Sequence, residues 1–434
     1  MRLRRALPLL VLLAGAAVST SAQTVEKDRQ RGLAMLREVR GLLERHYRDP
    51  TFGGRELSAR FAEAEAQMAA ASSEQMTYAV MASTLEALDD SHTFFIPPGL
   101  AAATDFGWTA RLIGERCFVV DVKPNSDAAR QGLAVGDEIL SLEGQKPERA
   151  TLWPRLLMVR LSQPLPLTHL TVVDAEGRTR ALALRSRPAL ERDGRALSLR
   201  EYLDVLSHAQ QERERGHFAD AGDVLVWRLA GFDKEGRSIV EGIQRARRAR
   251  ALVLDLRGNG GGDAGALRRL TGAFFRPPGP ISIGWLESRG RLRALLAPVW
   301  PRERAFDGPL VVVVDSESAS AAEVFARTIQ LKGRGKVVGD RTGGAVMLAR
   351  THVRMQARQK RLVAYAVSIT EAEVIMPDGS ALEKTGLTPD VVVLPSAADL
   401  RAHTDPMLAR AVELAGAGLS SEAAARLLPP PPHD

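Results

Sequence analysis

The sequence predicts a mixed α/β (α+β) protein built from three successive regions, each indicated by the spacing of its apolar residues. Apolar side chains recur at helical spacing through the first part of the chain, from Leu33 to Leu88. Short strand-like runs separated by turns follow from about 104 to 187. Strands then alternate with helices between 224 and 339, which is typical of a sheet with parallel pairs and covering helices.

The first region is predicted to contain three helices. The first extends from about Thr24 to Asp49, where an Asp-Pro pair ends it, and the second covers Phe61–Met68. The third follows Ser73 and closes near Asp90. A Ser-His pair comes directly after this helix, ahead of a Pro-Pro-Gly turn.

The second region is predicted to be a small sheet with short helices. Its elements are strands at Cys117–Val122, Glu138–Leu142 and Leu170–Val173, and helices at Ala128–Gln131 and Trp153–Arg160. Cys117 is the one cysteine of the chain, so no intrachain disulfide can form, and we interpret it as a small buried side chain.

The third region is predicted to hold a sheet buried on both faces. Ala251–Leu256 and Leu310–Val314 are continuous apolar runs, as expected for central parallel strands. The remaining predicted elements are strands at 224–229, 336–339, 352–355 and 362–369, and helices at 239–248 and 321–330. Asp405-Pro406 is predicted to begin the last helix, ahead of a disordered proline tail at 429–432.

The beginning of the chain predicts a cleaved signal peptide over residues 1–22. Arg2, Arg4 and Arg5 precede a short apolar run from Leu7 to Ala17, which small residues follow before Gln23. The alternative is a membrane anchor, but the run is too short for stable membrane insertion. Removal would reduce the net charge from +7 to +4, because three arginines are lost. We therefore expect a periplasmic or secreted protein that does not bind nucleic acid.

The sequence predicts neither a cofactor nor a metal site. Its eight histidines are dispersed, and neither a His-Glu-x-x-His motif nor paired cysteines occur. Gly260-x-Gly262-x-x-Gly265 fits a dinucleotide fingerprint. We discount that match because the acidic residue expected downstream is unconvincing and exported proteins rarely retain nicotinamide cofactors.

The strongest candidate for chemistry is residues 314–323, where a buried strand leads directly into a helix. This places Ser320 at a helix N-terminus, whose free N–H groups can hold an oxyanion formed when the hydroxyl attacks a carbonyl. The alternative is that the serines of this segment only cap the helix.

This segment resembles the nucleophile segment of tail-specific (C-terminal processing) and tricorn-core serine peptidases. With Glu323 on the family's glutamate, the resemblance makes Ser320 the nucleophile, and the Val-Gly-Asp-x-Thr-Gly-Gly run at 338–344 also matches. It implies an exported serine endopeptidase with a crotonase-like (ClpP-like) mixed-sheet core. The run from Ser126 to Leu140 closely resembles a PDZ domain of bacterial proteases.

The resemblance divides the chain into domains and implies what the enzyme binds. The divisions are a helical region at 23–102, a PDZ domain at 103–188, the peptidase core at 189–397 and a C-terminal helix with tail at 398–434. The implied partner is a polypeptide substrate, recognised by its C-terminus. The sequence leaves the oligomeric state open.

One departure from the family concerns the general base. Tail-specific members carry a lysine where this chain has Ala345. The tricorn-type branch instead implies His92 as the base, with Ser91 and Glu383 orienting it. Two alternatives stay open: a catalytically inactive peptide-binding scaffold, in which His92 only closes a helix, and a displaced lysine base, with Lys332, Lys336 and Lys384 as candidates.

Two further sets of residues follow from the resemblance. The oxyanion hole is expected to pair the N–H of Ala321 with that of Gly261 or its neighbour Gly260. In the PDZ domain, Phe106-Gly107-Trp108 lies where such domains hold a peptide carboxylate. The alternative for the two aromatic residues is an ordinary place in the core.

Overall fold

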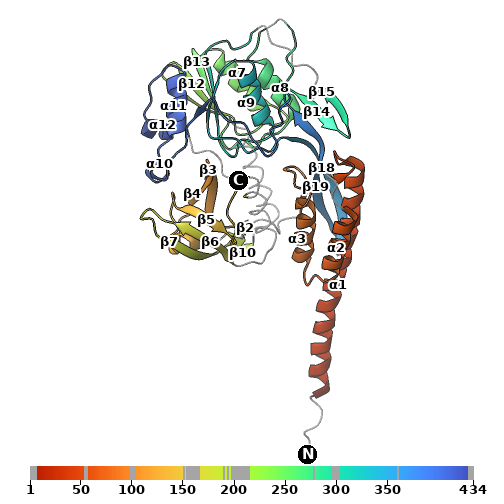
Figure 1. The fold of residues 1–434 in the computed structure, drawn as a ribbon. Helices are drawn as coiled ribbons and strands as arrows, with labels where there is room; N and C mark the ends of the chain where they lie inside the picture. Colours follow the sequence, from red (N-terminus) through yellow and green to blue (C-terminus); the bar gives the residue numbers. More distant parts are fainter. Residues whose placement is uncertain are drawn as a thin grey trace, which may run out of the picture. The chain divides into compact units, whose positions relative to one another are not determined.

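The computed structural model of the 434-residue chain describes residues 7–52, 57–97, 104–149, 152, 167–188, 191–192, 195–196, 216–276, 279–294, 304–358 and 361–428. The chain divides into two compact units (Figure 1). The first comprises 1–102, 157–164 and 349–371, and the second comprises 103–156, 165–348 and 372–434. Both helices and sheets occur, which confirms the mixed α/β class. The predicted helix at 153–160 and the proline tail lie outside the described residues.

The first unit packs three helices against the middle of a long strand. Its elements are α1 (Leu7–His46), α2 (Leu57–Ala69), α3 (Glu74–Glu86), β1 (Phe94–Ile96), and most of β18 (Met347–Arg358) and β19 (Arg361–Ile375). Its core joins Leu36 and Leu43 of α1 to Phe61, Met81 and the strand residue Phe95. β1 runs antiparallel to β19, which also pairs with β18.

Helix α1 begins at Leu7, earlier than the predicted start at Thr24. No proline follows Pro8 before His46, so nothing in this stretch removes a helical N–H donor. The described residues include no helix with the length and apolar character needed to span a membrane.

The second unit is organised around a six-stranded sheet. In spatial order its strands are β11 (His217–Ala221), β12 (Val224–Arg228), β13 (Ala251–Asp255), β16 (Leu310–Val314), β17 (Lys336–Gly339) and β20 (Val391–Val392). The strands from β12 to β20 are parallel, and β11 is an antiparallel edge strand. The predicted parallel sheet is therefore present.

Helices cover both faces of this sheet, which explains its continuous apolar strands. One face packs against α7 (Arg237–Ala246), α8 (Ala264–Gly272) and α9 (Ala321–Leu331). The other packs against α11 (Pro406–Leu414) and α12 (Ser421–Leu427). Successive residues of β13 alternate between the two cores, so no position faces water. The prediction that the helix at Asp405-Pro406 is the last was wrong, because α12 follows it, capped by Ser420.

A second, antiparallel sheet in the same unit contains the predicted short strands. Its order is β3 (Trp108–Ile113), β4 (Arg116–Val122), β5 (Glu138–Leu142), β6 (Leu167–Val173) and β7 (Thr179–Arg185), with α4 (Asp127–Arg130) beside β7. β3 is therefore an edge strand. Smaller pairs join β2 (Thr104–Asp105) to β8 (Arg187–Pro188) and β9 (Glu191–Arg192) to β10 (Arg195–Ala196). β14 (Trp285–Ser288) pairs with both β15 (Arg291–Ala294) and the end of β19, so it continues the sheet of β1, β18 and β19. The final helical segments also include α10 (Ala397–Ala402).

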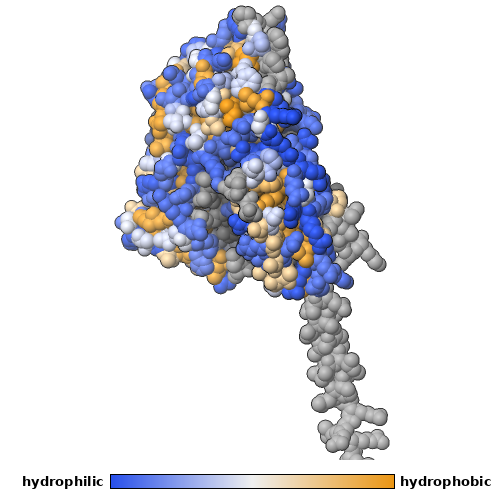
Figure 2. All heavy atoms as spheres, turned by 45° about the vertical axis from the view of Figure 1, so that its right-hand side comes forward, coloured by the Kyte–Doolittle hydropathy of each residue, from blue (hydrophilic) through white to orange (hydrophobic). Residues whose placement is uncertain are grey.

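Hydrophilic residues predominate on the face drawn in Figure 2, with apolar residues in smaller groups between them. Large apolar side chains that are exposed include Trp285, Leu292, Val353 and Met355. Such scattered exposure is normal for a globular protein and by itself assigns no function.

Candidate active site

Ser320 occupies a strained turn between β16 and α9. It has φ 56° and ψ −118°, a positive φ that few non-glycine residues adopt, and it is the N-cap residue of α9. Such backbone strain costs about 1–3 kcal/mol and persists where the surroundings impose it, often at functional sites. In hydrolases, a sharp strand-to-helix turn of this kind exposes the nucleophile above the sheet. Here the Ser320 side chain is half-buried. The turn differs from that of those hydrolases in sequence, because the chain has no Gly-x-Ser-x-Gly motif.

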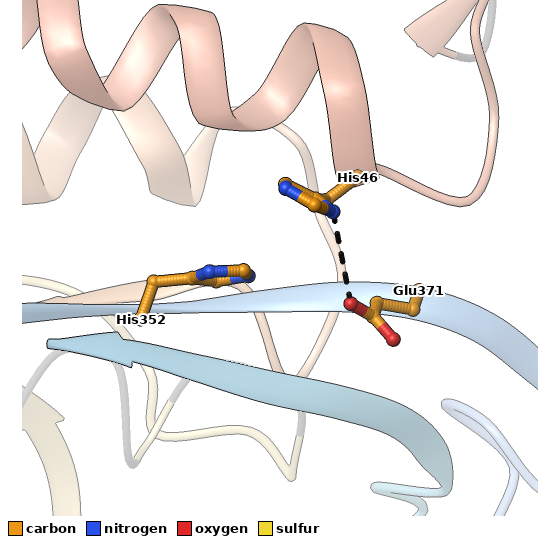
Figure 3. Close-up of side chains that lie close together, drawn as sticks. All are labelled: His46, His352 and Glu371. Atoms are coloured by element: carbon orange, nitrogen blue, oxygen red, sulfur yellow. Dashed lines mark ion pairs between the residues drawn. The ribbon is translucent and has the colours of Figure 1, made fainter.

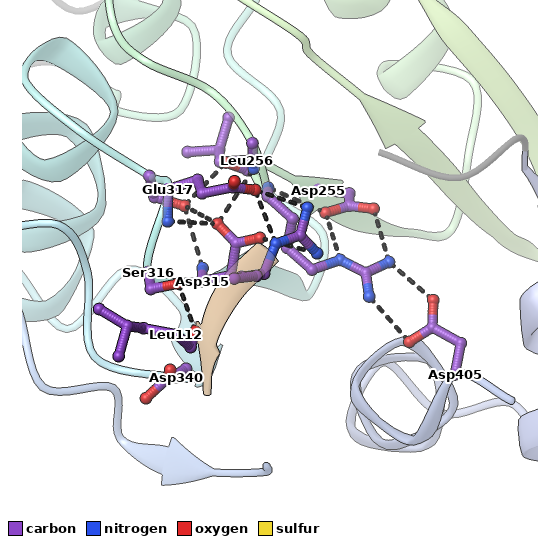
Figure 4. Close-up of polar contacts among 12 residues, drawn as sticks. Leu112, Asp255, Leu256, Asp315, Ser316, Glu317, Asp340 and Asp405 are labelled. Carbon is purple, nitrogen blue, oxygen red and sulfur yellow. Dashed lines mark hydrogen bonds and ion pairs between the residues drawn. The ribbon is translucent and has the colours of Figure 1, made fainter. Parts of the chain in front are cut away.

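A buried polar network lies beneath this turn (Figure 4). The Asp315 carboxylate accepts hydrogen bonds from the Gly258 N–H (3.0 Å) and from the Ser318 hydroxyl (3.2 Å). The Ser318 hydroxyl also donates to the Leu256 carbonyl at 2.8 Å, and the residue is fully buried. The Ser318 hydroxyl therefore stabilises the loop through these hydrogen bonds. Ser320 differs because its side chain is only half-buried.

Glu323 ties the turn to the following glycine-rich segment. Its carboxylate accepts hydrogen bonds from the Thr342 hydroxyl and from the N–H groups of Gly344 (2.9 Å), Ala345 (3.0 Å) and Ser320 (3.2 Å). Complete burial raises the pKa of Glu323 to about 7, against the opposing effect of these four donors. Glu323, three residues after the serine, therefore fixes the backbone of Ser320. This is a structural reason for a glutamate at that position of the motif.

Ala345, at the position where the resemblance expects a lysine, lies next to Ser320. Its carbonyl oxygen accepts the Ser320 N–H at 2.9 Å. Its methyl side chain has no atom that can accept a proton. Glu383 belongs to the same cluster, since its Oε2 accepts the N–H of the next residue, Val346, at 2.9 Å.

The glycine-rich turn after β13 contacts the Ser320 turn directly. A Cβ atom added to Gly261 would lie 2.6 Å from the Ser320 Cβ and 2.9 Å from the Ala321 nitrogen, so no side chain fits there. The Gly261 N–H donates to the Asn259 Oδ1 at 2.9 Å. Within the described part of the chain, the N–H groups of Gly260 and Ala321 have no acceptor. Of the two glycines predicted for the oxyanion hole, Gly260 therefore has the available donor.

Ser91 and His92 form a second local arrangement, in the first unit. Asp90 Oδ1 accepts the N–H groups of His92 (3.0 Å) and Thr93 (2.7 Å), which bends the backbone. Adjacent side chains diverge in an extended chain, but this bend brings the Ser91 hydroxyl within 2.6 Å of the His92 Nδ1. Burial lowers the pKa of His92, while the Asp90 charge partly opposes that change. Burial therefore favours the neutral form of the imidazole.

Asp90 is itself fixed by residues distant in sequence. The Thr370 hydroxyl donates to its Oδ1 at 2.6 Å, and the Tyr47 hydroxyl donates to its Oδ2 at 2.9 Å. The structure thus brings Ser91 and His92 together in one unit, and it brings Ser320, Ala321, Gly261 and Glu383 into one region of the other.

The residues predicted to bind a peptide carboxylate are well buried. Phe106 is 7% exposed and Trp108 is 6% exposed, and their ring centroids lie 6.2 Å apart. The Gly107 N–H donates to the Asp105 carboxylate at 3.0 Å. This burial favours the alternative, in which the two aromatic residues are part of a core.

The three candidate lysines are all exposed at the protein surface. Lysines that act as bases or nucleophiles are commonly desolvated, as in a hydrophobic pocket. Lys384 approaches the site through its backbone, whose N–H donates to the Gly344 carbonyl at 2.7 Å.

Sequence reasoning missed two residues that build the site. Asn259 bridges two turns: its Nδ2 donates to the Leu229 carbonyl at 2.7 Å, and its own carbonyl accepts the Ala319 N–H at 2.9 Å. Asp315 organises the loop before Ser320. Both follow the end of a buried parallel strand, and this position was the available signal, because polar residues there meet at one edge of the sheet.

Comparisons with known proteins agree with this geometry. Residues 223–393 match the model of peptidase family S41. The chain is 25% identical over 368 residues to carboxyl-terminal-processing peptidase 2, chloroplastic, of Arabidopsis thaliana, which covers 80% of this chain and 66% of that protein. It is 25% identical over 233 residues to the tricorn protease of Thermoplasma volcanium, covering 52% of this chain and 20% of that protein.

The fold has a solved counterpart in mature CPAF. The TM-score is 0.61 at 16% identity, over 86% of this chain and 94% of that one. The chain spans about two thirds of the length of the Arabidopsis relative and a fifth of the length of the tricorn protease. Residues 223–393 thus form a domain that matches peptidase family S41, and the chain is similar to tail-specific and tricorn-like serine peptidases.

Proposed function

We propose that this protein is an exported serine endopeptidase that cleaves peptide bonds through an acyl-enzyme on Ser320, with His92 as the base. The observation that carries the proposal is the strained Ser320 turn. It places a half-buried hydroxyl beside the Ala321 N–H, which has no acceptor among the described residues. The resemblance to tail-specific peptidases expects a lysine base at position 345, where this chain has alanine. A hydroxyl nucleophile needs a base at neutral pH, and burial favours the neutral imidazole of His92 that this role requires.

In the proposed acylation step, the His92 imidazole takes the Ser320 proton as the oxygen attacks the scissile carbonyl. The Ala321 and Gly260 N–H groups donate to the resulting oxyanion. The imidazolium then protonates the leaving amine, and the C–N bond breaks. Ser91 holds the imidazole through its bond to Nδ1. In this proposal Glu383 acts with Ser91 to orient the His92 ring.

Deacylation repeats the same chemistry with water. His92 removes a proton from a water molecule, which attacks the ester carbonyl. The Ser320 oxygen leaves as the imidazolium returns its proton, and the enzyme is regenerated. The backbone of the Ser320 turn does not need to change in either step, because Glu323 and Gly261 hold it.

We further propose that the antiparallel sheet β3–β7 is a PDZ domain that presents the substrate's C-terminal segment. The edge position of β3 supports this, since a peptide can add to a free strand edge. β3 also contacts the loop before Ser320: Arg111 donates to Glu317 at 2.7 Å, and the Leu112 carbonyl accepts the Ser316 hydroxyl. The Arabidopsis relative is named a carboxyl-terminal-processing peptidase, which agrees with C-terminal recognition.

Export through a cleaved signal peptide is part of the same proposal. It rests on the three arginines and the short apolar run at the start of the chain. The mass of the protein recovered from the producing cells tests it. We expect the mature chain to begin at Gln23, and recovery of uncleaved protein in the cytoplasm would contradict export.

The decisive test of the nucleophile is Ser320→Ala. We expect this variant to lose peptide cleavage and labelling by a fluorophosphonate probe, because the acyl-accepting oxygen is absent. Ser72→Ala, which removes an exposed hydroxyl on the first unit, is the matched control and should keep both. Labelling that persists in Ser320→Ala would refute the assignment.

The identity of the base is tested with two further variants. His92→Ala should reduce kcat by about 10²–10⁴-fold, which is the usual contribution of a positioned base. Lys384→Ala should keep the activity if His92 is the base. The reverse result would establish a displaced lysine, and a wild-type protein that binds peptides without cleaving them would establish the scaffold alternative.

A further inference from the structure

Three side chains that could bind a metal gather in the first unit, outside the proposed catalytic residues (Figure 3). His46 is the last residue of α1, His352 lies on β18, and Glu371 lies on β19. Their donor atoms all lie within 4.8 Å of one another. The His46 Nδ1 is 3.9 Å from the Glu371 Oε1, and the two imidazole rings lie 4.7 Å apart between centroids.

Burial distinguishes this cluster from a chance surface grouping. His352 is 9% exposed, and its Nε2 is buried without a hydrogen-bond partner in the described structure. A buried polar atom left unpaired costs free energy, so such an atom needs a reason to persist. The His46 and Glu371 side chains are more accessible, at 36% and 18%, which leaves a path by which an ion can enter.

The donor set selects the class of ion. Imidazole nitrogens suit zinc, copper and nickel, whereas magnesium and calcium prefer oxygen ligands. Two imidazoles with one carboxylate form a known zinc ligand set that leaves a fourth position for water. With Zn–N and Zn–O distances near 2.0–2.2 Å, the donor atoms of such a site are roughly 3.3 Å apart. Small side-chain rotations would bring the present donors to that spacing.

We propose that His46, His352 and Glu371 form a zinc-binding site that joins the end of α1 to β18 and β19. A bound ion would tie together three elements that lie far apart in the sequence, and it would keep one position open for water. Arg350 competes with a metal ion for the Glu371 carboxylate, because its Nε lies 3.3 Å from the Glu371 Oε1. Arg354, the other nearby arginine, is paired with Glu38 at 2.7 Å.

This competitor gives the proposal a specific signature. An incoming Zn²⁺ must share or displace Arg350 at the carboxylate, so the arginine weakens binding by repulsion and by occupying a ligand. Removing that positive charge should therefore strengthen zinc binding. Zinc bound at a site distant from Arg350 has no reason to respond in this direction.

The experiment is a titration of the purified full-length protein with ZnCl₂, followed by calorimetry and by competition with a chromophoric chelator. We expect one tight site per chain. His46→Gln, His352→Gln and Glu371→Gln should each weaken it by at least about tenfold, and Arg350→Gln should strengthen it severalfold. His169→Gln, which removes an exposed histidine on β6, is the matched control and should bind as the wild type does.

Two additional readouts keep the result independent of folding and of peptidase activity. Bound Co²⁺ in place of zinc should give the visible absorption of a four-coordinate site, lost in His46→Gln, whose half-exposed side chain can be replaced without disturbing the core. Zinc should also raise the melting temperature of the wild type more than that of this variant. A wild-type protein that binds no zinc, or variants that bind it equally well, would overturn the proposal.

Discussion

The Ser91–His92 turn and the Ser320 turn are built by opposite means. The first is bent by side chains: Asp90 accepts two backbone N–H groups and is held by hydroxyls from two other elements. The second is bent by close backbone packing, where Gly261 leaves no room for a side chain and a buried glutamate holds the N–H groups. A turn made by side chains can be tuned by charge, whereas one made by backbone packing is sensitive to volume.

This contrast predicts that adding a single methyl group at the Ser320 turn causes the largest loss of catalytic activity. Gly261→Ala would place a Cβ 2.6 Å from the Ser320 Cβ, at a residue with φ +95°. Because displacement of a reacting group by about 1 Å can cost about a hundredfold, we expect kcat/KM to fall at least that much. Cleavage of an unfolded protein substrate measures it.

The matched control is Gly418→Ala, since nothing lies within 4 Å of a Cβ added at that exposed position. It should keep wild-type activity and stability. If Gly261→Ala also cleaved normally, the Ser320 turn would not be limited by volume and the contrast would fail.

The second prediction concerns the pH dependence of stability at Glu323. Its pKa is about 7 in the folded protein and near 4.5 when exposed, so between these values the folded state binds more protons. Stability from this group is therefore complete below about pH 4.5 and is lost as the pH rises towards 7, by roughly 3 kcal/mol at most. Urea unfolding at pH 5, 6 and 7 measures the free energy of unfolding.

Glu323→Gln has no ionisable group, so it should remove this pH dependence. It should also be less stable at pH 5 by about 1–3 kcal/mol, because an amide NH₂ cannot accept the hydrogen bonds of the carboxyl group. Parallel curves for the variant and the wild type would show that burial of Glu323 does not control stability in this range.

The third prediction uses Ala345, which contacts Ser320 through its backbone. Introducing Ala345→Lys into the His92→Ala protein should raise kcat by about tenfold or more, because it places an amine beside the nucleophile. Ala345→Met in the same background, with a side chain of similar length but no amine, should give no recovery. Equal rates for these two double variants would contradict the placement of Ala345.

The prediction with the smallest expected effect tests whether the charge of Asp90 changes the pKa of His92. Asp90→Asn keeps an oxygen for the two backbone N–H groups but removes the charge that raises the pKa of His92. The pKa of His92 sets the acidic limb of the kcat/KM profile, so this limb should lie at lower pH in the variant than in the wild type. Asp89→Asn, one residue earlier, should leave it in place.

Local sequence patterns predicted most of the elements that carry these groups. The strands at 310–314 and 336–339 have the predicted limits, because continuous valine-rich runs admit few other conformations. Ser73 was correctly placed ahead of its helix, whose third residue donates to its hydroxyl. The start of α1 was predicted less accurately, because apolar periodicity does not mark where helical hydrogen bonding begins, and α12 was missed.

The roles of particular polar groups depended on contacts that no local pattern contains. The sequence left Gly260 and Gly261 as alternatives, and the bond from the Gly261 N–H to Asn259 supports Gly260 in the proposed oxyanion hole. It also offered no basis for joining His46 to His352 and Glu371, because ligand spacing is informative when the ligands come from one short segment.

By itself, the sequence determined the fold class, the resemblance to tail-specific and tricorn-like peptidases, the Ser320 segment and the alanine at position 345, because these depend on residue types at short spacing. The tertiary structure decided which N–H groups are available, why Ser318 differs from Ser320, and how far burial raises the pKa of Glu323. The physical reason is that hydrogen-bond partners and desolvation are set by residues from distant parts of the chain, which meet only after folding.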